Sequence, residues 1–223
     1  MAVKEAAMRT NEKLPSEPVL LTLPGIDNSG PGHWQTIWER ERSDMHRVHF
    51  GSWNNPERDS WVRRLNAAIA AAGRPVVLVA HSLGCHAVAW WNASEPTLAS
   101  QVAAAFLVAP PDVEHAPIDH RLQPFGPVPR KRLTFPALVV GSRNDPYASY
   151  GHVRAMARIW GARIVDAGPM GHINSDSGLL DWPYGKYLVR RLIEAVTPSP
   201  LPLLASGAVA TMQGQGIGTR APR

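Results

Sequence analysis

The stretch Ala80-His81-Ser82-Leu83-Gly84 decides the fold, because it joins an apolar run to a helix-like segment. The run Val76-Val77-Leu78-Val79 precedes it, and the segment from Cys85 to Asn92 follows it. This order predicts a buried strand, a sharp turn and a helix with Ser82 at the apex, the arrangement called a nucleophile elbow. The turn lifts the serine hydroxyl clear of the sheet and aims the first helical amides at the same point. Ala80 stands where the usual Gly-x-Ser-x-Gly pattern has glycine, and alanine is the next smallest residue.

A serine nucleophile needs a base and an orienting acid, and on such an elbow the chain order is Ser, then Asp or Glu, then His. Asp145 follows the apolar run 137–140, and His172 follows the run 162–165. Both side chains are therefore expected at the carboxyl ends of neighbouring strands, where open α/β sheets bind their ligands. The sequence predicts a catalytic triad of Ser82, Asp145 and His172.

The acid and the base each have alternatives. Asp145 lies in an Asn-Asp-Pro sequence that is common in turns, so bracing that turn is its other role. Asp112, beyond the apolar run 102–109, is a rival acid. The rival bases are His81, His86, His115 and His120. His81 adjoins Ser82, and neighbouring residues of an extended segment point to opposite faces, so His81 is poorly placed as the base.

The oxyanion that forms during acyl transfer needs two amide donors. One is expected from Leu83, directly after the nucleophile, and the second from Ile26 in the loop 24–34 that follows the first strand. Gly25 permits the tight turn in this loop. The loop has neither a Gly-Lys-Ser/Thr ending nor a Gly-x-Gly-x-x-Gly run, so its glycines do not indicate a phosphate site.

The segment from Pro111 to Arg132 is long, contains several prolines and follows a strand at the same rim. Loops longer than about 12 to 15 residues without regular structure are usually functional or disordered. We predict that this loop forms a wall of the substrate pocket, with Leu122 and Phe125 as apolar contacts; a passive surface connection is the alternative. Trp34 and Trp182 follow the oxyanion and histidine loops and are expected to line the pocket too, although large aromatics more often pack in cores.

Strand-like and helix-like segments alternate along the chain. Strands are expected over residues 19–23, 46–50, 76–80, 102–109, 137–141 and 162–166. Helices are expected over residues 34–43, 57–72, 83–94, 149–160 and 184–196. This alternation predicts a six-stranded, mostly parallel sheet with helices on both faces.

Several motifs carry a family resemblance. They are Leu23-Pro24-Gly25, Asn28-Ser29-Gly30, His33-Trp34, Trp53-Asn54-Asn55-Pro56, His81-Ser82-Leu83-Gly84-Cys85, Ser142-Arg143-Asn144-Asp145-Pro146-Tyr147, Gly171-His172-Ile173-Asn174 and Trp182-Pro183. Over about residues 19–195 the chain resembles the small serine hydrolases related to retinoblastoma-binding-protein hydrolases and bacterial YdeN-like proteins. The resemblance implies a three-layer α/β-hydrolase fold and the triad Ser82, Asp145 and His172. The chain has no room for the helical cap of larger α/β-hydrolases, so we expect a minimal cap.

Length and composition suit one folded domain, since 223 residues with 44% hydrophobic content can bury a core. We assign residues 18–197 to this α/β-hydrolase domain. Residues 1–17 and the Pro- and Gly-containing tail 198–223 have little to bury and are expected to be flexible.

Charge and cysteine content limit the partners. Of the formal net charge of +5, Arg220 and Arg223 in the tail contribute two, and residues 1–17 are balanced. No nucleic-acid motif accompanies the Arg130-Lys131-Arg132 cluster, so nucleic-acid binding is not expected.

A single cysteine excludes an intramolecular disulfide, and neither a signal peptide nor a membrane span is recognised, which points to the cytoplasm. Cys85, His81 and His86 do not have a metal-ligand spacing, so we expect no metal and no cofactor.

These features predict a serine hydrolase that cleaves an ester or amide of a small molecule through an acyl-enzyme. The alternatives are an acyltransferase or thioesterase with the same triad, and a non-catalytic binding protein on a hydrolase scaffold. A monomer or small homo-oligomer is expected.

Overall fold

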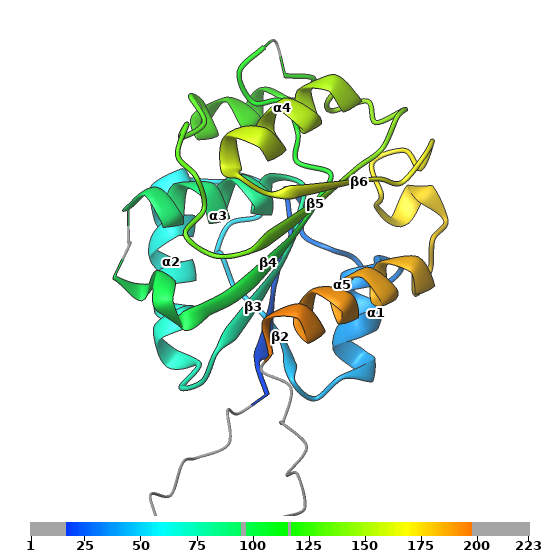
Figure 1. Ribbon diagram of the computed structural model, residues 1–223. Helices are drawn as coiled ribbons and strands as arrows, with labels where there is room; N and C mark the ends of the chain where they lie inside the picture. Colours follow the sequence, from blue (N-terminus) through cyan, green and yellow to red (C-terminus); the bar gives the residue numbers. More distant parts are fainter. Residues whose placement is uncertain (1–16, 95–96, 116, 198–223) are drawn as a thin grey trace, which may run out of the picture.

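The computed structural model describes residues 17–94, 97–115 and 117–197 (Figure 1). Apart from Glu17, the segments expected to be flexible, 1–17 and 198–223, lie outside the described residues. The described chain folds as one sheet with helices packed against both of its faces.

All neighbouring strands of the sheet are parallel, in the order β2-β1-β3-β4-β5-β6. The strands are β1 (Val19–Leu23), β2 (Met45–Arg47), β3 (Val76–His81), β4 (Val102–Val108), β5 (Ala137–Gly141) and β6 (Arg163–Asp166). The prediction of a six-stranded parallel sheet is confirmed. Only β2 differs clearly, because it ends at Arg47 rather than at residue 50. Phe50 lies beyond the strand and stacks on Trp61 with ring centroids 4.3 Å apart, so its apolar character reflects core packing.

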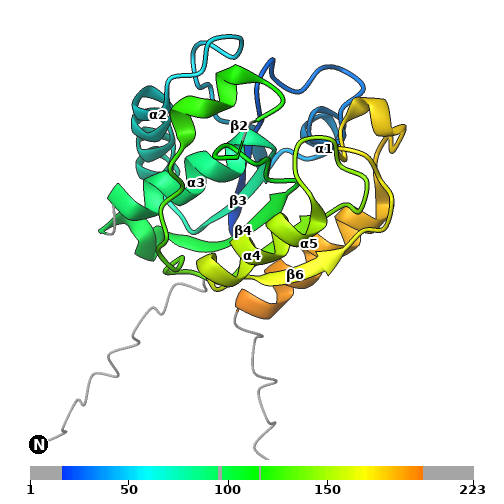
Figure 2. The ribbon, with the colours of Figure 1, turned by 90° about the horizontal axis from the view of Figure 1, so that it is seen from above.

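The helices divide between the two faces of the sheet (Figure 2). They are α1 (Trp34–Glu41), α2 (Arg58–Ala71), α3 (Leu83–Ser94), α4 (Tyr150–Trp160) and α5 (Pro183–Val196). Apolar residues of α2, α3 and α4 share one buried cluster, and those of α1 and α5 share the other. The short 3-10 helices are η1 (Leu98–Gln101), η2 (His120–Phe125) and η3 (Ser175–Ser177). This is the three-layer arrangement expected of an α/β-hydrolase.

Strand β3 shows why the two clusters form. Its side chains alternate, so that Val76, Leu78 and Ala80 enter the cluster on the α3 side, whereas Val77 and Val79 enter the opposite one. Every residue of β3 is buried, as expected for a central parallel strand covered on both faces. The strand therefore holds the following turn on a rigid support.

The start of α3 passes very close to the end of β1. A Cβ atom added to Gly84 would lie 2.2 Å from the carbonyl oxygen of Leu23, closer than two such atoms can approach. Gly84 therefore sets how near the helix and the strand can come. The second residue of α4, Gly151, has no such neighbour, because an added Cβ would meet only the Ser149 side chain at 3.9 Å.

We predict that Gly84→Ala lowers the free energy of unfolding by at least about 2 kcal/mol, since the added methyl must displace backbone. Urea denaturation followed by circular dichroism measures the change. Gly151→Ala is the matched control at the same position of another helix, and it should leave stability unchanged or raise it by up to about 1 kcal/mol. Equal stability of Gly84→Ala and Gly151→Ala would contradict the close approach of α3 to the end of β1.

Candidate active site

Ser82 forms the turn between β3 and α3, and its backbone is left-handed, with a φ of 53°. A non-glycine residue keeps this conformation only where its surroundings impose it. Here the end of β4 does so: the Ser82 N–H donates to the carbonyl oxygen of Val108 at 2.9 Å. The Cys85 thiol donates to the same oxygen at 3.4 Å. The serine side chain is consequently held at the carboxyl end of the sheet.

The structure brings the three predicted triad side chains into one hydrogen-bonded row. His172 Nε2 lies 2.9 Å from Ser82 Oγ, and His172 Nδ1 lies 2.9 Å from each carboxylate oxygen of Asp145. Asp145 follows β5 and His172 follows β6, so distant segments meet at one rim. With Nδ1–H donating to the carboxylate, Nε2 is the atom that accepts the serine proton.

Three residues for which the sequence predicts another role or none hold His172 in place. The His81 side chain donates from Nε2 to the His172 carbonyl at 2.9 Å, and Tyr147 packs on the His172 ring with centroids 4.2 Å apart. Trp34 Nε1 donates to the carbonyl of Ile173 at 2.8 Å. His81 therefore points away from Ser82, as the alternation of an extended chain predicts, and its partner is the histidine loop.

The acid and histidine loops are also joined directly. The side-chain oxygen of Asn144 accepts the Gly171 N–H at 2.7 Å, and Ser142 Oγ accepts the Met170 N–H at 2.9 Å. The Tyr147 N–H donates to Asp145 Oδ1 at 2.9 Å. Small polar residues around Asp145 thus fix the acid relative to the base.

The two predicted oxyanion donors lie beside the nucleophile. A Cβ atom on Gly25 would be 2.7 Å from Ser82 Cβ and 3.2 Å from the Leu83 nitrogen, so the Gly25–Ile26 backbone lies against the elbow. Within the described residues, no hydrogen bond occupies the amide of Leu83 or of Ile26. Both amides are free to donate to a bound oxygen.

A pocket of about 310 Å³ contains Ser82 and His172 in its wall. The remaining lining residues, mostly polar, are Gly25, Ile26, Asp27, Asn28, His33, His81, Arg121, Tyr147, Asn174, Ser175 and Asp176. Arg121 reaches into this wall from η2 and donates to both carboxylate oxygens of Asp27, at 2.8 and 2.9 Å. It also donates to Asp119 at 2.7 Å. The loop 111–132 therefore does contribute to the pocket, through an arginine.

The four apolar substrate contacts predicted from the sequence are wrong. The side chains of Trp34, Leu122, Phe125 and Trp182 are each at most 2% exposed and lie in the hydrophobic clusters, not in the pocket wall. Leu122 and Phe125 are three residues apart in a 3-10 helix, so both face the core while Arg121 faces the pocket. Trp34 and Trp182 pack against each other with ring centroids 5.2 Å apart.

The rival residues lie elsewhere. His86 donates from Nε2 to the carbonyl of Pro111 at 2.7 Å. His120 is exposed and lies 3.9 Å from Asp119. Asp112 and His115 contact each other, with His115 Nδ1 3.2 Å from the carboxylate. Within the described part of the chain, none of these side chains contacts Ser82.

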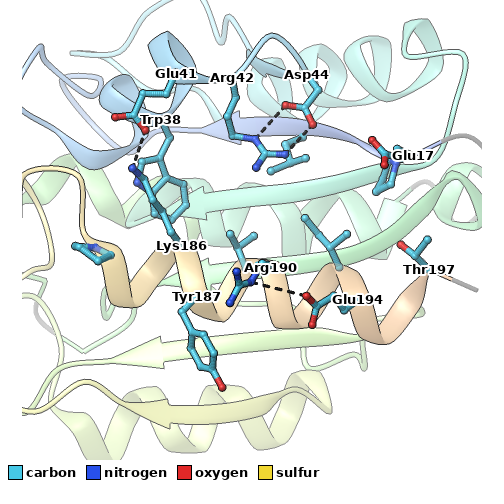
Figure 3. A pocket seen from close by; sticks show the side chains of 15 residues that line it. Glu17, Trp38, Glu41, Arg42, Asp44, Lys186, Tyr187, Arg190, Glu194 and Thr197 are labelled. Carbon is cyan, nitrogen blue, oxygen red and sulfur yellow. Dashed lines mark hydrogen bonds and ion pairs between the residues drawn. The ribbon is translucent and has the colours of Figure 1, made fainter. Parts of the chain in front are cut away.

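A larger groove of about 660 Å³ lies between α1 and α5 (Figure 3). Lys186 of α5 pairs with Glu41 of α1 at 2.6 Å and so joins the two walls, whereas Arg42 pairs with Asp44 at 2.7 Å within one of them. The groove contains no member of the triad. Its size therefore does not make it the site of the chemistry.

Three buried histidines, of which His33 and His81 line the pocket, are neutral at pH 7. Burial, together with the charges of Arg47 and His172, lowers the pKa of His33 to about 3. Burial also lowers the pKa of His86 to about 4 and that of His81 well below its usual value. In the unfolded chain each of these side chains regains a pKa near 6.5 and binds a proton more readily.

We predict that stability falls as the pH drops from 6.5 towards 4, because the unfolded chain then binds more protons than the folded one. Each buried histidine contributes about 1 kcal/mol per pH unit to this slope. Urea denaturation at a series of pH values measures it. His33→Asn, which keeps an oxygen to cap α1, should reduce the slope by about 1 kcal/mol per pH unit. The exposed His120 supplies the matched control, His120→Asn, and an unchanged slope in His33→Asn would contradict the prediction.

The fold and the hydrogen-bonded site together define an α/β-hydrolase-fold enzyme of the serine hydrolase class. The family model described as serine hydrolase matches residues 20–191, and the chain belongs to this family. It is therefore a hydrolase, as the motifs predict. No curated protein matches the chain in sequence. Within the described residues, no helix is both long and apolar enough to cross a membrane.

Solved structures agree with this assignment. A protein described as a YdeN-like hydrolase from Pectobacterium atrosepticum is 28% identical, with a TM-score of 0.72 over 82% of this chain and 94% of that one. The YdeN gene product of B. subtilis is 17% identical, with a TM-score of 0.65 over 79% and 99%. Est1E from Butyrivibrio proteoclasticus, at 11% identity, has a TM-score of 0.57 over 82% and 90% and shares the fold. The resemblance to YdeN-like hydrolases is confirmed.

Proposed function

We propose that the enzyme hydrolyses a carboxylic ester or amide of a small molecule through an acyl-enzyme on Ser82. The observation that carries this proposal is the row of side chains in which His172 Nε2 lies 2.9 Å from Ser82 Oγ and Nδ1 lies 2.9 Å from Asp145. Such a row activates a hydroxyl that is a weak nucleophile on its own.

In the proposed reaction His172 takes the proton of Ser82 as the hydroxyl oxygen attacks the substrate carbonyl. Asp145 keeps the imidazole in the Nδ1–H tautomer and offsets the positive charge that develops on it. The amides of Leu83 and Ile26 donate to the oxyanion. His172 then returns the proton to the leaving group, and a water molecule activated by the same imidazole releases the acyl group from Ser82.

The pocket wall supports a small and polar substrate. Besides Ser82 and His172, it presents the Arg121–Asp27 ion pair and the side chains of Asn174 and Asp176. His33 accepts the Gln35 N–H at Nδ1, so the neutral ring carries its proton on Nε2, a buried atom with no partner among the described residues. A substrate carbonyl or hydroxyl group would satisfy this donor.

A fluorophosphonate probe is expected to label the purified protein at Ser82, because the activated hydroxyl attacks phosphorus as it attacks a carbonyl. Intact-protein mass spectrometry measures the adduct. Ser82→Ala should lose the adduct and keep its circular dichroism spectrum, and Ser100→Ala, an exposed serine remote from the pocket, should keep both. A wild-type protein that stays unlabelled would count against the proposal.

Asp145→Asn should lower kcat for a small ester by about 10³- to 10⁴-fold with little change in KM, since an asparagine amide stabilises the wrong imidazole tautomer. Steady-state kinetics at pH 7 to 8 measures this. Asp59→Asn, the same change at an exposed position on α2, is the control and should retain full activity. Similar kcat values for Asp145→Asn and Asp59→Asn would contradict a role of Asp145 in the reaction.

A further inference from the structure

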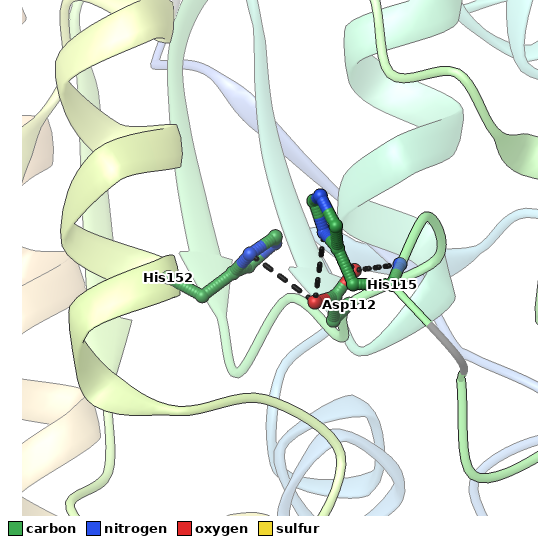
Figure 4. A group of neighbouring side chains, drawn as sticks. All are labelled: Asp112, His115 and His152. Carbon is green, nitrogen blue, oxygen red and sulfur yellow. Dashed lines mark hydrogen bonds and ion pairs between the residues drawn. The ribbon is translucent and has the colours of Figure 1, made fainter.

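A second group of chemically capable side chains lies outside the catalytic pocket (Figure 4). Asp112 and His115 belong to the loop after β4, and His152 belongs to the first turn of α4. One carboxylate oxygen and one nitrogen of each ring lie within 4.8 Å of one another. From the sequence, no metal is expected at Cys85, His81 and His86, and Asp112 and His115 are only rival members of the triad.

Both oxygens of Asp112 take part in the cluster, and Oδ1 lies 3.3 Å from His115 Nδ1. Oδ1 accepts the N–H groups of Glu114 and His115, both at 2.9 Å, and so shapes the turn that brings the His115 ring back over the carboxylate. Oδ2 faces the two imidazoles, 3.2 Å from His115 Nδ1 and 3.3 Å from His152 Nδ1. One carboxylate oxygen and two ring nitrogens therefore converge, while the remaining oxygen holds the loop.

This donor set suits a transition metal of borderline softness. Two imidazoles and one carboxylate are characteristic zinc ligands, whereas calcium and magnesium prefer oxygen alone. Ligands about 2.0–2.1 Å from a tetrahedral zinc ion lie roughly 3.3–3.4 Å apart, close to the two measured separations. His115 is largely exposed, which gives an ion access from solvent.

We propose that Asp112, His115 and His152 bind a divalent transition-metal ion, Zn²⁺ or a close analogue, at a site separate from the catalytic triad. Asp112 Oδ2 and the Nδ1 atoms of both histidines are the ligands, and water completes the coordination. Because the ion takes the Nδ1 lone pairs, both rings carry their protons on Nε2 when it is bound.

Unpaired buried atoms behind the cluster fit this tautomer. His152 Nε2 and His86 Nδ1 are both buried and have no hydrogen-bond partner among the described residues. His86 uses its Nε2 proton to bond Pro111, so its Nδ1 is an acceptor, and His152 is near enough to lower the pKa of His86. When the metal is bound, His152 Nε2 carries a proton and can donate a hydrogen bond, whereas His86 Nδ1 can only accept one. The two atoms then have complementary roles.

The ion would tie the loop after β4 to α4 and, through the backbone, to the acid loop. The Asp112 N–H donates to the carbonyl of Tyr147 at 2.9 Å, and Tyr147 packs on the catalytic histidine. The main expected effect is on stability, because an ion that binds only the folded chain raises its free energy of unfolding.

Cobalt and zinc binding test the proposal on the full chain without a histidine tag, after treatment with a chelator. Co²⁺ should produce the visible absorption of a four- or five-coordinate site, and Zn²⁺ should remove this absorption by competition. Excess Zn²⁺ should also raise the thermal midpoint. His115→Ala and Asp112→Asn should each weaken Co²⁺ binding at least about 10-fold and abolish the thermal shift. Asparagine keeps the Oδ1 acceptor that shapes the turn.

His120→Ala is the matched control, because His120 is an exposed histidine of the same loop that lies outside the cluster. It should bind Co²⁺ as the wild type does. Unchanged binding in His115→Ala, or equal weakening in His120→Ala, would overturn the metal site. Neither result bears on fluorophosphonate labelling of Ser82, so this proposal and the proposed hydrolysis fail independently.

Discussion

The active site depends on one steric constraint, the close approach of the backbone after β1 to the turn that carries Ser82. Gly84 and Gly25 mark the two ends of this contact. At Gly84 there is room for no side chain beside the Leu23 carbonyl, and at Gly25 an added Cβ would meet the Ser82 side chain. The same contact places the Gly25–Ile26 backbone against the elbow, where a Cβ on Gly25 would lie 3.2 Å from the Leu83 nitrogen. Backbone packing therefore positions Ser82 and the segments that carry the two amides predicted to donate to an oxyanion, and such packing does not rearrange as charge develops.

His172, the predicted base, is positioned differently, because it lies on a loop and is held by contacts from several directions. The His81 ring fixes its carbonyl, Tyr147 covers its ring, and Trp34 holds the next residue from the α1 side. His81 and Trp34 thus act through hydrogen bonds to the short loop that carries His172 and Ile173. Their contribution is to the orientation of the imidazole, and none of the three needs to touch the substrate.

Periodicity and motif spacing predict the strands, the helices and the three triad positions, because each depends on local sequence and on the rule that parallel strands end at one rim. The sequence could not reveal how the loop 111–132 turns. Its apolar residues Leu122 and Phe125 were predicted at the substrate, yet their three-residue spacing in η2 places them in the core and leaves Arg121 at the pocket. The bond from His81 to His172 was also missed, since alternation indicates which way a side chain points and not which loop it meets.

The groove of about 660 Å³ and the pocket at Ser82 lie at opposite ends of the strands, and topology explains why the predicted triad side chains gather at the second. The groove between α1 and α5 is lined by Glu17 and Thr197, the ends of the described domain, and lies near the amino end of β1. The turn that carries Ser82 does not open there, and none of the three predicted triad residues lines the groove. At the other rim the turn after β3 and the loops after β1, β5 and β6 converge on a polar pocket of half the volume. In a parallel sheet the direction of the strands, more than the size of a cavity, determines where chemistry is possible.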